Sequence, residues 1–229
     1  MRKLSLTLPA IVASLALSSA ATADDTDQRL DYLSQQFSAT ETHAAYWQNG
    51  WFGLFAGVTA VNGIAYTQTE GEHNKYDRVV GFTTSFLGAA DMLMNPMKTH
   101  EFSRQLSAMP DGSASERQAK LAQAEAWLHQ AAERERYERS FLNHALSGVV
   151  NGLAGLAVAY DDKRPDDGWV TFLTGMITSE IKIYTSPTTM TETEAAYNSG
   201  KFSATAAMSE QPRWQVAAFG PVLSASYRF

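Results

Sequence analysis

Residues 44–69 read AAYWQNGWFGLFAGVTAVNGIAYTQT, a stretch of the chain without a single charged side chain. Gly53, Gly57 and Ala60 recur within it at helical spacing, so they share one helix face and let another backbone approach closely. Aromatic residues flank the stretch at both ends, as in the interface belt of a membrane helix. A helix buried inside a soluble bundle is the alternative, because it too is apolar all round.

A second stretch, residues 140–160, aligns without gaps with residues 46–66 and matches asparagine with asparagine and tyrosine with tyrosine. Each stretch continues into a charged loop and then into a second apolar segment that ends at a proline. The pattern predicts two apolar helical hairpins, over residues 44–97 and 140–187. It also leads to the hypothesis that the two hairpins arose by internal duplication.

Residues 98–139, between the two hairpins, predict an amphipathic connector helix. A proline–glycine turn precedes Ser113 and Glu116, which have the S-x-x-E spacing of a capping box. The residues that follow form an apolar stripe at helical spacing: Leu121, Ala124, Leu128 and Ala131. Further along, Glu135 and Arg139 are spaced for a favourable i,i+4 ion pair.

Polar segments complete the chain, with residues 24–43 before the first hairpin and residues 188–229 after the second. The end of the last segment alternates apolar and polar residues up to Phe229, which predicts a terminal strand, with an extended arm as the alternative. The predicted fold class is therefore all-α. We expect a helical bundle of two apolar hairpins joined by a long amphipathic helix, with an extended C-terminal tail.

Residues 1–23 have the three parts of a secretory signal peptide. Arg2 and Lys3 supply the positive start, residues 4–17 are uncharged and mostly apolar, and the segment ends in Ala-Thr-Ala. The apolar run is shorter than the ~20 residues that a membrane anchor needs. We therefore expect cleavage after Ala23 and export to a bacterial-type cell envelope.

Charge and composition exclude several classes of protein. Removing Arg2 and Lys3 with the leader changes the net charge from −6 to −8, and an acidic chain lacks the basic face that nucleic acid requires. The chain has no cysteine, which rules out disulfides, thiolate catalysis and cysteine-bound metals. We expect no nucleic-acid partner.

Catalytic and metal-binding motifs are not evident in the sequence. The five histidines do not form H-x-x-x-H or H-E-x-x-H, and there is no G-x-S-x-G elbow and no P-loop. Four aspartates surround a turn over residues 161–167, but a solvated turn explains them better than a cation site does. We therefore expect no catalytic residue, no metal site and no cofactor.

Four apolar segments raise the question of four membrane spans. The second helix of each hairpin has a charge-free run of only about twelve residues, Val79–Ala90 and Gly168–Ser179, which is short for a span. Export of the N-terminus would also place the connector, with its seven Lys and Arg residues, outside the cytoplasm, against the positive-inside rule. A simple four-span inner-membrane protein is disfavoured; a bundle that buries its own apolar faces, or sits on a membrane, avoids the conflict.

Polar residues inside the apolar segments are the candidate site, because an unpaired polar group costs several kcal/mol when buried. They are Asn62, Asp91, Asn151, Glu180 and Lys182. Asp91 and Lys182 occupy matching places in the two hairpins, so we expect them to form an ion pair with Glu180 nearby. Their role is to hold the bundle together or, alternatively, to form a polar site for a ligand or ion.

Four segments within residues 105–190 carry a resemblance to known proteins: MPDG at 109–112, ERQAKLAQAE at 116–125, NHA at 143–145 and EIKIYTSP at 180–187. They resemble an uncharacterised family of exported bacterial envelope proteins with paired apolar helical hairpins. The resemblance implies a helical exported protein and no known activity.

These patterns together predict a non-catalytic, membrane-associated helical protein of the bacterial cell envelope with a structural or interaction role. Its partners would be membrane lipid or an envelope protein, and glycine-rich helix faces would allow a homo-oligomer. The alternative is a periplasmic binding module for a lipid or other apolar ligand. An enzyme acting on membrane lipid is a third class, which no nucleophile–base pattern supports.

Overall fold

The computed structural model describes residues 9–201, 213–219 and 222–228, with side chains from residue 25 to residue 201. The chain is almost entirely helical, which confirms the predicted all-α bundle. Its elements are α1 (Pro9–Gln68), α2 (Glu72–Met94), α3 (Thr99–Ser107), α4 (Ala114–Glu138), α5 (Phe141–Leu156), the π-helix η1 (Ala157–Asp161), α6 (Pro165–Tyr184), α7 (Thr189–Asn198), β1 (Arg213–Phe219) and β2 (Val222–Arg228).

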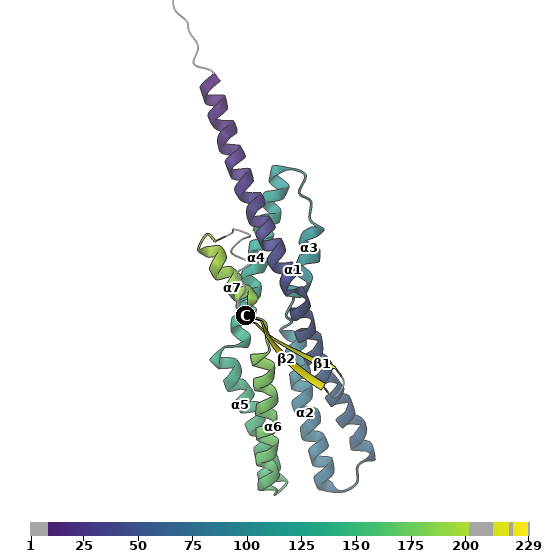
Figure 1. Cartoon of the computed structure of the whole chain (residues 1–229). Helices are drawn as coiled ribbons and strands as arrows, with labels where there is room; N and C mark the ends of the chain where they lie inside the picture. Colours follow the sequence, from purple (N-terminus) through teal and green to yellow (C-terminus); the bar gives the residue numbers. More distant parts are fainter. Residues whose placement is uncertain (1–8, 202–212, 220–221, 229) are drawn as a thin grey trace, which may run out of the picture.

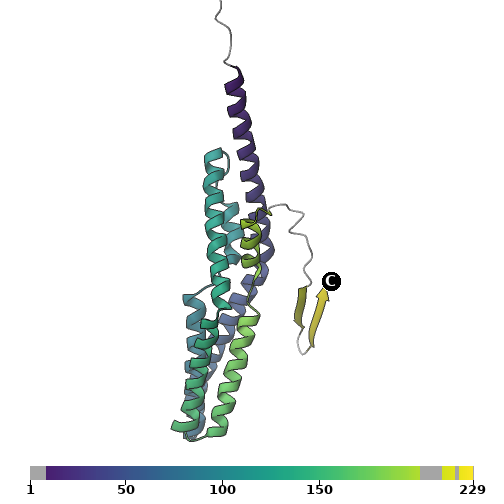
Figure 2. The same cartoon turned by 90° about the vertical axis from the view of Figure 1, so that its left-hand side faces the viewer.

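The long helix α1 runs through both halves of an elongated molecule (Figures 1 and 2). Its C-terminal part pairs with α2, and α5 pairs with α6 to form the second hairpin beside the first. In the other half, α3, α4 and α7 pack around residues 25–43 of α1, and we call this assembly the head bundle. We call the hairpin ends next to the head bundle the base and the ends at the loops 69–71 and 162–164 the tip.

Several predicted boundaries differ from the structure. No break separates residues 24–43 from the first hairpin, because α1 is continuous across both. The connector over residues 98–139 consists of two helices, α3 and α4, instead of one. The C-terminal segment is not extended throughout, because it contains α7 and the antiparallel pair of β1 and β2; Phe229 lies outside the described residues.

The head bundle has the buried apolar core of an ordinary globular domain. Phe37 of α1 meets Phe102 of α3 edge to face, with ring centres 5.6 Å apart, and Phe102 stacks on Trp127 of α4 at 5.2 Å. The predicted stripe of α4 faces this core through Ala124, Leu128 and Ala131. Burial of these side chains is what stabilises the head bundle.

Helix ends of the head bundle are capped by two carboxylates. Glu116 and Ser113 form the predicted capping box at the start of α4. Glu135 of α4 accepts hydrogen bonds from the backbone N–H groups of Met190 and Thr191, at 3.2 and 2.8 Å, in the first turn of α7. Glu135 therefore caps α7 and does not form the predicted pair with Arg139.

The two helices within each hairpin approach closely at glycines, but not at the glycines that the sequence indicated. Nothing lies within 4 Å of a Cβ built on Gly53 or Gly57, so their face of α1 is open. In the second hairpin, a Cβ on Gly168 would lie 2.6 Å from the carbonyl oxygen of Gly155, so neither position admits a side chain without a shift. The close approach is between α5 and α6 near the tip.

Large apolar side chains cover the outside of the hairpins. Every exposed large hydrophobic residue between residues 25 and 201 lies on the hairpins, and α3, α4 and α7 carry none. Leu153 of α5 is 63% exposed and Ile177 of α6 is 60% exposed. Of the two alternatives, the hairpins therefore do not bury all of their own apolar faces, because each hairpin is only two helices thick and keeps an outer face.

Truncation of a core ring tests the division between the two halves. We expect Phe37→Ala to lower the unfolding free energy in detergent by about 3–5 kcal/mol, because it leaves a cavity in the head bundle. Phe141→Ala, at an 87% exposed position of α5, is the control and should change it by less than about 1 kcal/mol. Equal losses for the two variants would contradict the assignment of the core.

The pH dependence of stability should report on Glu135. Burial raises the pKa of this carboxyl above its ordinary 4.5, although hydrogen bonds from Thr191 and Met190 favour the charged form. The folded state therefore binds this proton more tightly than the unfolded state does. The resulting contribution to the unfolding free energy is fully present below pH 4.5 and is lost as the pH rises through the raised pKa. The unfolding free energy of the wild type minus that of Glu135→Gln should fall as the pH rises above 4.5; a rising difference would contradict the burial argument.

Candidate functional site

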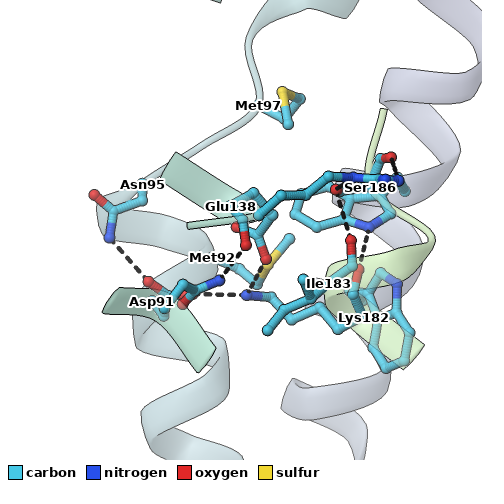
Figure 3. Close-up of polar contacts among 12 residues, drawn as sticks. Asp91, Met92, Asn95, Met97, Glu138, Lys182, Ile183 and Ser186 are labelled. Carbon is cyan, nitrogen blue, oxygen red and sulfur yellow. Dashed lines mark hydrogen bonds and ion pairs between the residues drawn. The ribbon is translucent and has the colours of Figure 1, made fainter. Parts of the chain in front are cut away.

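A buried ion cluster joins three helices at the base of the hairpins (Figure 3). The Lys182 Nζ of α6 lies 3.0 Å from the Asp91 Oδ2 of α2 and 2.7 Å from the Glu138 Oε1 of α4. Lys182 and Glu138 are both buried. The predicted contact between Asp91 and Lys182 is therefore present, and Glu138 is a partner that the sequence analysis missed.

A second cation completes the cluster. Arg134 of α4 donates from Nη1 to Glu138 Oε2 at 2.7 Å and from Nε to the carbonyl oxygen of Asn95 at 2.8 Å. Asn95 in turn donates from Nδ2 to Asp91 Oδ1 at 2.9 Å. Two carboxylates thus face two cations, and the net charge of the buried cluster is zero. We call Asp91, Arg134, Glu138 and Lys182 the base cluster.

Two side chains of α1, Trp47 and Gln48, make hydrogen bonds around the base cluster and link it to the first hairpin. Trp47 Nε1 donates to the carbonyl oxygen of Lys182 at 3.0 Å, and the Trp47 ring lies 5.8 Å from Lys182 Nζ. Gln48 donates to the carbonyl oxygen of Met92 and accepts from the backbone N–H of Met97, at 2.9 and 2.7 Å. Backbone groups freed where α2 ends are therefore satisfied by one side chain.

The periodicity of α4 contained the signal for the missed carboxylates. Its buried stripe continues from Ala124, Leu128 and Ala131 at the same spacing to Glu135 and Glu138. A charged residue on a core stripe must find a partner, because burying it alone is costly. Extending the stripe by two more turns would have identified both glutamates as buried groups with structural partners.

Glu180 does not belong to the base cluster. It lies 2.9 Å from His144 Nδ1 within the second hairpin, and both side chains are about one-third exposed. Glu180 and Lys182 are two residues apart on α6, so they do not share a helix face. The expectation that Glu180 lies beside the Asp91–Lys182 pair is therefore wrong.

The two candidate asparagines lie in separate places. Asn62 donates to the carbonyl oxygen of Val58 at 2.9 Å and packs against Gly81. Asn151 donates to the carbonyl oxygen of Ser147 and to the hydroxyl of Ser179, at 2.9 and 3.1 Å. Each asparagine serves the contact inside its own hairpin, so the structure brings together only Asp91 and Lys182 among the five candidates.

A second set of polar contacts joins the hairpins at the tip. Arg164 forms an ion pair with Asp77 of α2, and Asp162 lies 2.7 Å from His73 Nδ1. Tyr76 donates to Asp161 at 2.8 Å. Two of the four aspartates of this turn, Asp161 and Asp162, thus bind side chains of the first hairpin. No cluster of three metal-ligating side chains occurs among the described residues.

Between the base and the tip, the hairpins enclose a cleft with a volume of about 890 Å³. Its walls come from α1, α2, α5 and α6, and residues of the base cluster and of the tip contacts close its two ends. Serine, threonine and asparagine side chains line it together with aliphatic ones. The size lies within the range of small-molecule sites, which is about 300–1,000 Å³.

Comparison with protein-family models, with curated proteins and with solved structures finds no match to this chain. The resemblance to exported envelope proteins and the internal duplication therefore stay predictions. One continuous helical segment of the described residues, Phe141–Asp161, is long and apolar enough by composition to cross a membrane. That segment comprises α5 and η1 of the second hairpin.

Removal of the central cation tests the base cluster. We expect Lys182→Met to lower the unfolding free energy by about 3–5 kcal/mol, because it leaves the buried Glu138 carboxylate with only one of its two cationic partners, Arg134. Adding Glu138→Gln to that variant should restore part of the loss. Lys98→Met, which changes an exposed lysine, is the matched control; a loss for Lys182→Met no greater than that of the control would contradict a buried, paired lysine.

Proposed function

We propose that this chain is a non-catalytic protein of a bacterial cell envelope that embeds its two hairpins in a membrane and has a structural or interaction role. The observation that carries the proposal is the contrast between the two halves. The head bundle buries its large apolar side chains, whereas the hairpins expose theirs. Monomeric soluble proteins rarely expose contiguous apolar surface of this kind.

Aromatic side chains at both ends of the hairpins support a membrane location. Tyr46 and Tyr184, at the base, are 77% and 69% exposed. Tyr160 and Trp169, at the tip, are 79% and 65% exposed. Tyrosine and tryptophan are enriched at the two membrane–water interfaces, because their rings have an apolar body and a polar end.

The exposed apolar side chains of the hairpins form a belt between the base and the tip. The height of this belt fits a membrane that thins around the protein. On α2, the charge-free run lies between Arg78 and Asp91, a distance of about 20 Å at 1.5 Å per residue. A typical hydrocarbon core is about 30 Å thick. Local thinning costs fractions of a kcal/mol per Å, so a short belt is compatible with insertion.

Export by cleavage after Ala23 belongs to the same proposal and would place the head bundle outside the cytoplasm. Membrane lipid is the proposed partner of the hairpins, and an envelope protein is the proposed partner of the head bundle. The open face at Gly53 and Gly57 is compatible with the predicted homo-oligomer. The alternative, a periplasmic module for an apolar ligand, has less support because it would leave the exposed apolar side chains of the hairpins in water.

Membrane fractionation tests this proposal. In bacteria that express the full chain, we expect the protein to remain in the membrane pellet through alkaline carbonate extraction and to be released by non-ionic detergent. Glutamate at two outward positions, Leu153→Glu with Ile177→Glu, should shift protein from the pellet to the soluble fraction, because charge is unfavourable in hydrocarbon.

The control for the fractionation experiment adds negative charge to the head bundle instead. Gln118 is exposed on α4, so Gln118→Glu should leave the distribution unchanged. Release of the wild-type protein by carbonate alone would contradict membrane embedding. Retention of the double variant to the same extent as the control would show that the outward faces do not contact lipid.

A further inference from the structure

On α6, polar side chains face the cleft and large apolar side chains face outward, which is the opposite of a soluble amphipathic helix. On the cleft side it presents three threonines, Thr171, Thr174 and Thr178, together with Val170. On the outside it presents Leu173 and Ile177, which are 52% and 60% exposed. A soluble amphipathic helix would turn its apolar stripe inward and its polar residues outward.

Hydroxyl groups in the cleft have unused hydrogen-bonding capacity. Ser85 of α2, Ser147 of α5 and Thr174 of α6 line the cleft, and their hydroxyls make none of the side-chain hydrogen bonds within the part of the chain that the structure describes. Thr171 and Thr178 donate to carbonyl oxygens four residues back, at 2.8 and 2.9 Å, which leaves their oxygens free to accept. The walls thus offer both donors and acceptors.

Aliphatic side chains such as Leu54, Val58 and Leu87 also line these walls, but an apolar occupant would leave the hydroxyl groups among them unsatisfied. A lipid chain would cover the three hydroxyls without satisfying them, and each buried unsatisfied group costs about 1–3 kcal/mol. Water or a small hydrogen-bonding solute would satisfy them. Polar groups at membrane depth are tolerated where they line a water-filled cavity.

We propose that the cleft between the hairpins is a water-filled site that admits small polar solutes, while the outward faces of the same helices contact lipid. This inference rests on the proposed membrane embedding. The base cluster and the tip contacts hold the two hairpins together at either end, which keeps the cleft open between them.

Cysteine accessibility tests the inference, and the chain is suited to it because it has no cysteine of its own. Ser147→Cys and Thr174→Cys place a thiol in the cleft, and Ser85→Cys is a further cleft position if either variant fails to fold. Leu153→Cys and Leu173→Cys each place a thiol on an outward face of the second hairpin. Ser115→Cys, on the exposed start of α4, is the aqueous reference.

The full-length variants, reconstituted in phosphatidylcholine–phosphatidylglycerol vesicles permeabilised to the reagent, would be treated with a trimethylammonium-ethyl methanethiosulfonate reagent. Because only the thiolate reacts and it forms in water, we expect cleft thiols to react at least about tenfold faster than outward thiols. Cleft thiols should approach the rate of Ser115→Cys. N-ethylmaleimide in denaturant confirms that every thiol is present.

Two other results are distinguishable from the expected one. Slow reaction in the cleft and on the outward faces, with a fast reference, would overturn the water-filled site and leave the membrane embedding intact; lipid or a second copy would then fill the cleft. Fast reaction at all positions would overturn the embedding and, with it, the contrast between the cleft and the outer faces.

Discussion

The buried carboxylate of Glu138 is the constraint on which the arrangement of the two halves depends. An ionised group that is wholly removed from water needs a cation and hydrogen bonds around it. Lys182 of α6 and Arg134 of α4 provide these, and Lys182 also binds Asp91 of α2. One charge requirement therefore fixes the head bundle and both hairpins relative to each other at the base.

The two halves of the molecule follow different rules of solvation. The head bundle buries aromatic and aliphatic side chains around Phe37 and presents a polar surface. The hairpins expose many of their aliphatic side chains, and both hydroxyl groups and aliphatic side chains line the cleft between them. The base cluster lies where the two halves meet, at the depth where an interface between water and hydrocarbon would lie under the proposed function. A neutral cluster is suited to that place because it carries no net charge toward the lipid.

The sequence was sufficient for the architecture and for one contact of the site. Apolar periodicity predicted the hairpins, and matching positions predicted the contact between Asp91 and Lys182. The sequence analysis missed Glu138, because the stripe of α4 was followed only as far as Ala131. The contact with Glu138 also means that the charges of Asp91 and Lys182 cannot simply be exchanged. The exchange would place an aspartate beside the Glu138 carboxylate. The cleft could not be predicted from the sequence either, because it depends on the distance between the two hairpins, which the sequence pattern does not specify.

Under the proposed function, lipid or detergent must cover the outward faces of the hairpins. The most direct test is size-exclusion chromatography of the full chain with combined light-scattering, absorbance and refractive-index detection, which separates protein mass from bound detergent mass. We expect a uniform particle with a substantial detergent belt, and aggregation when detergent is removed. A detergent-free, soluble monomer that keeps its helical circular-dichroism spectrum would contradict it.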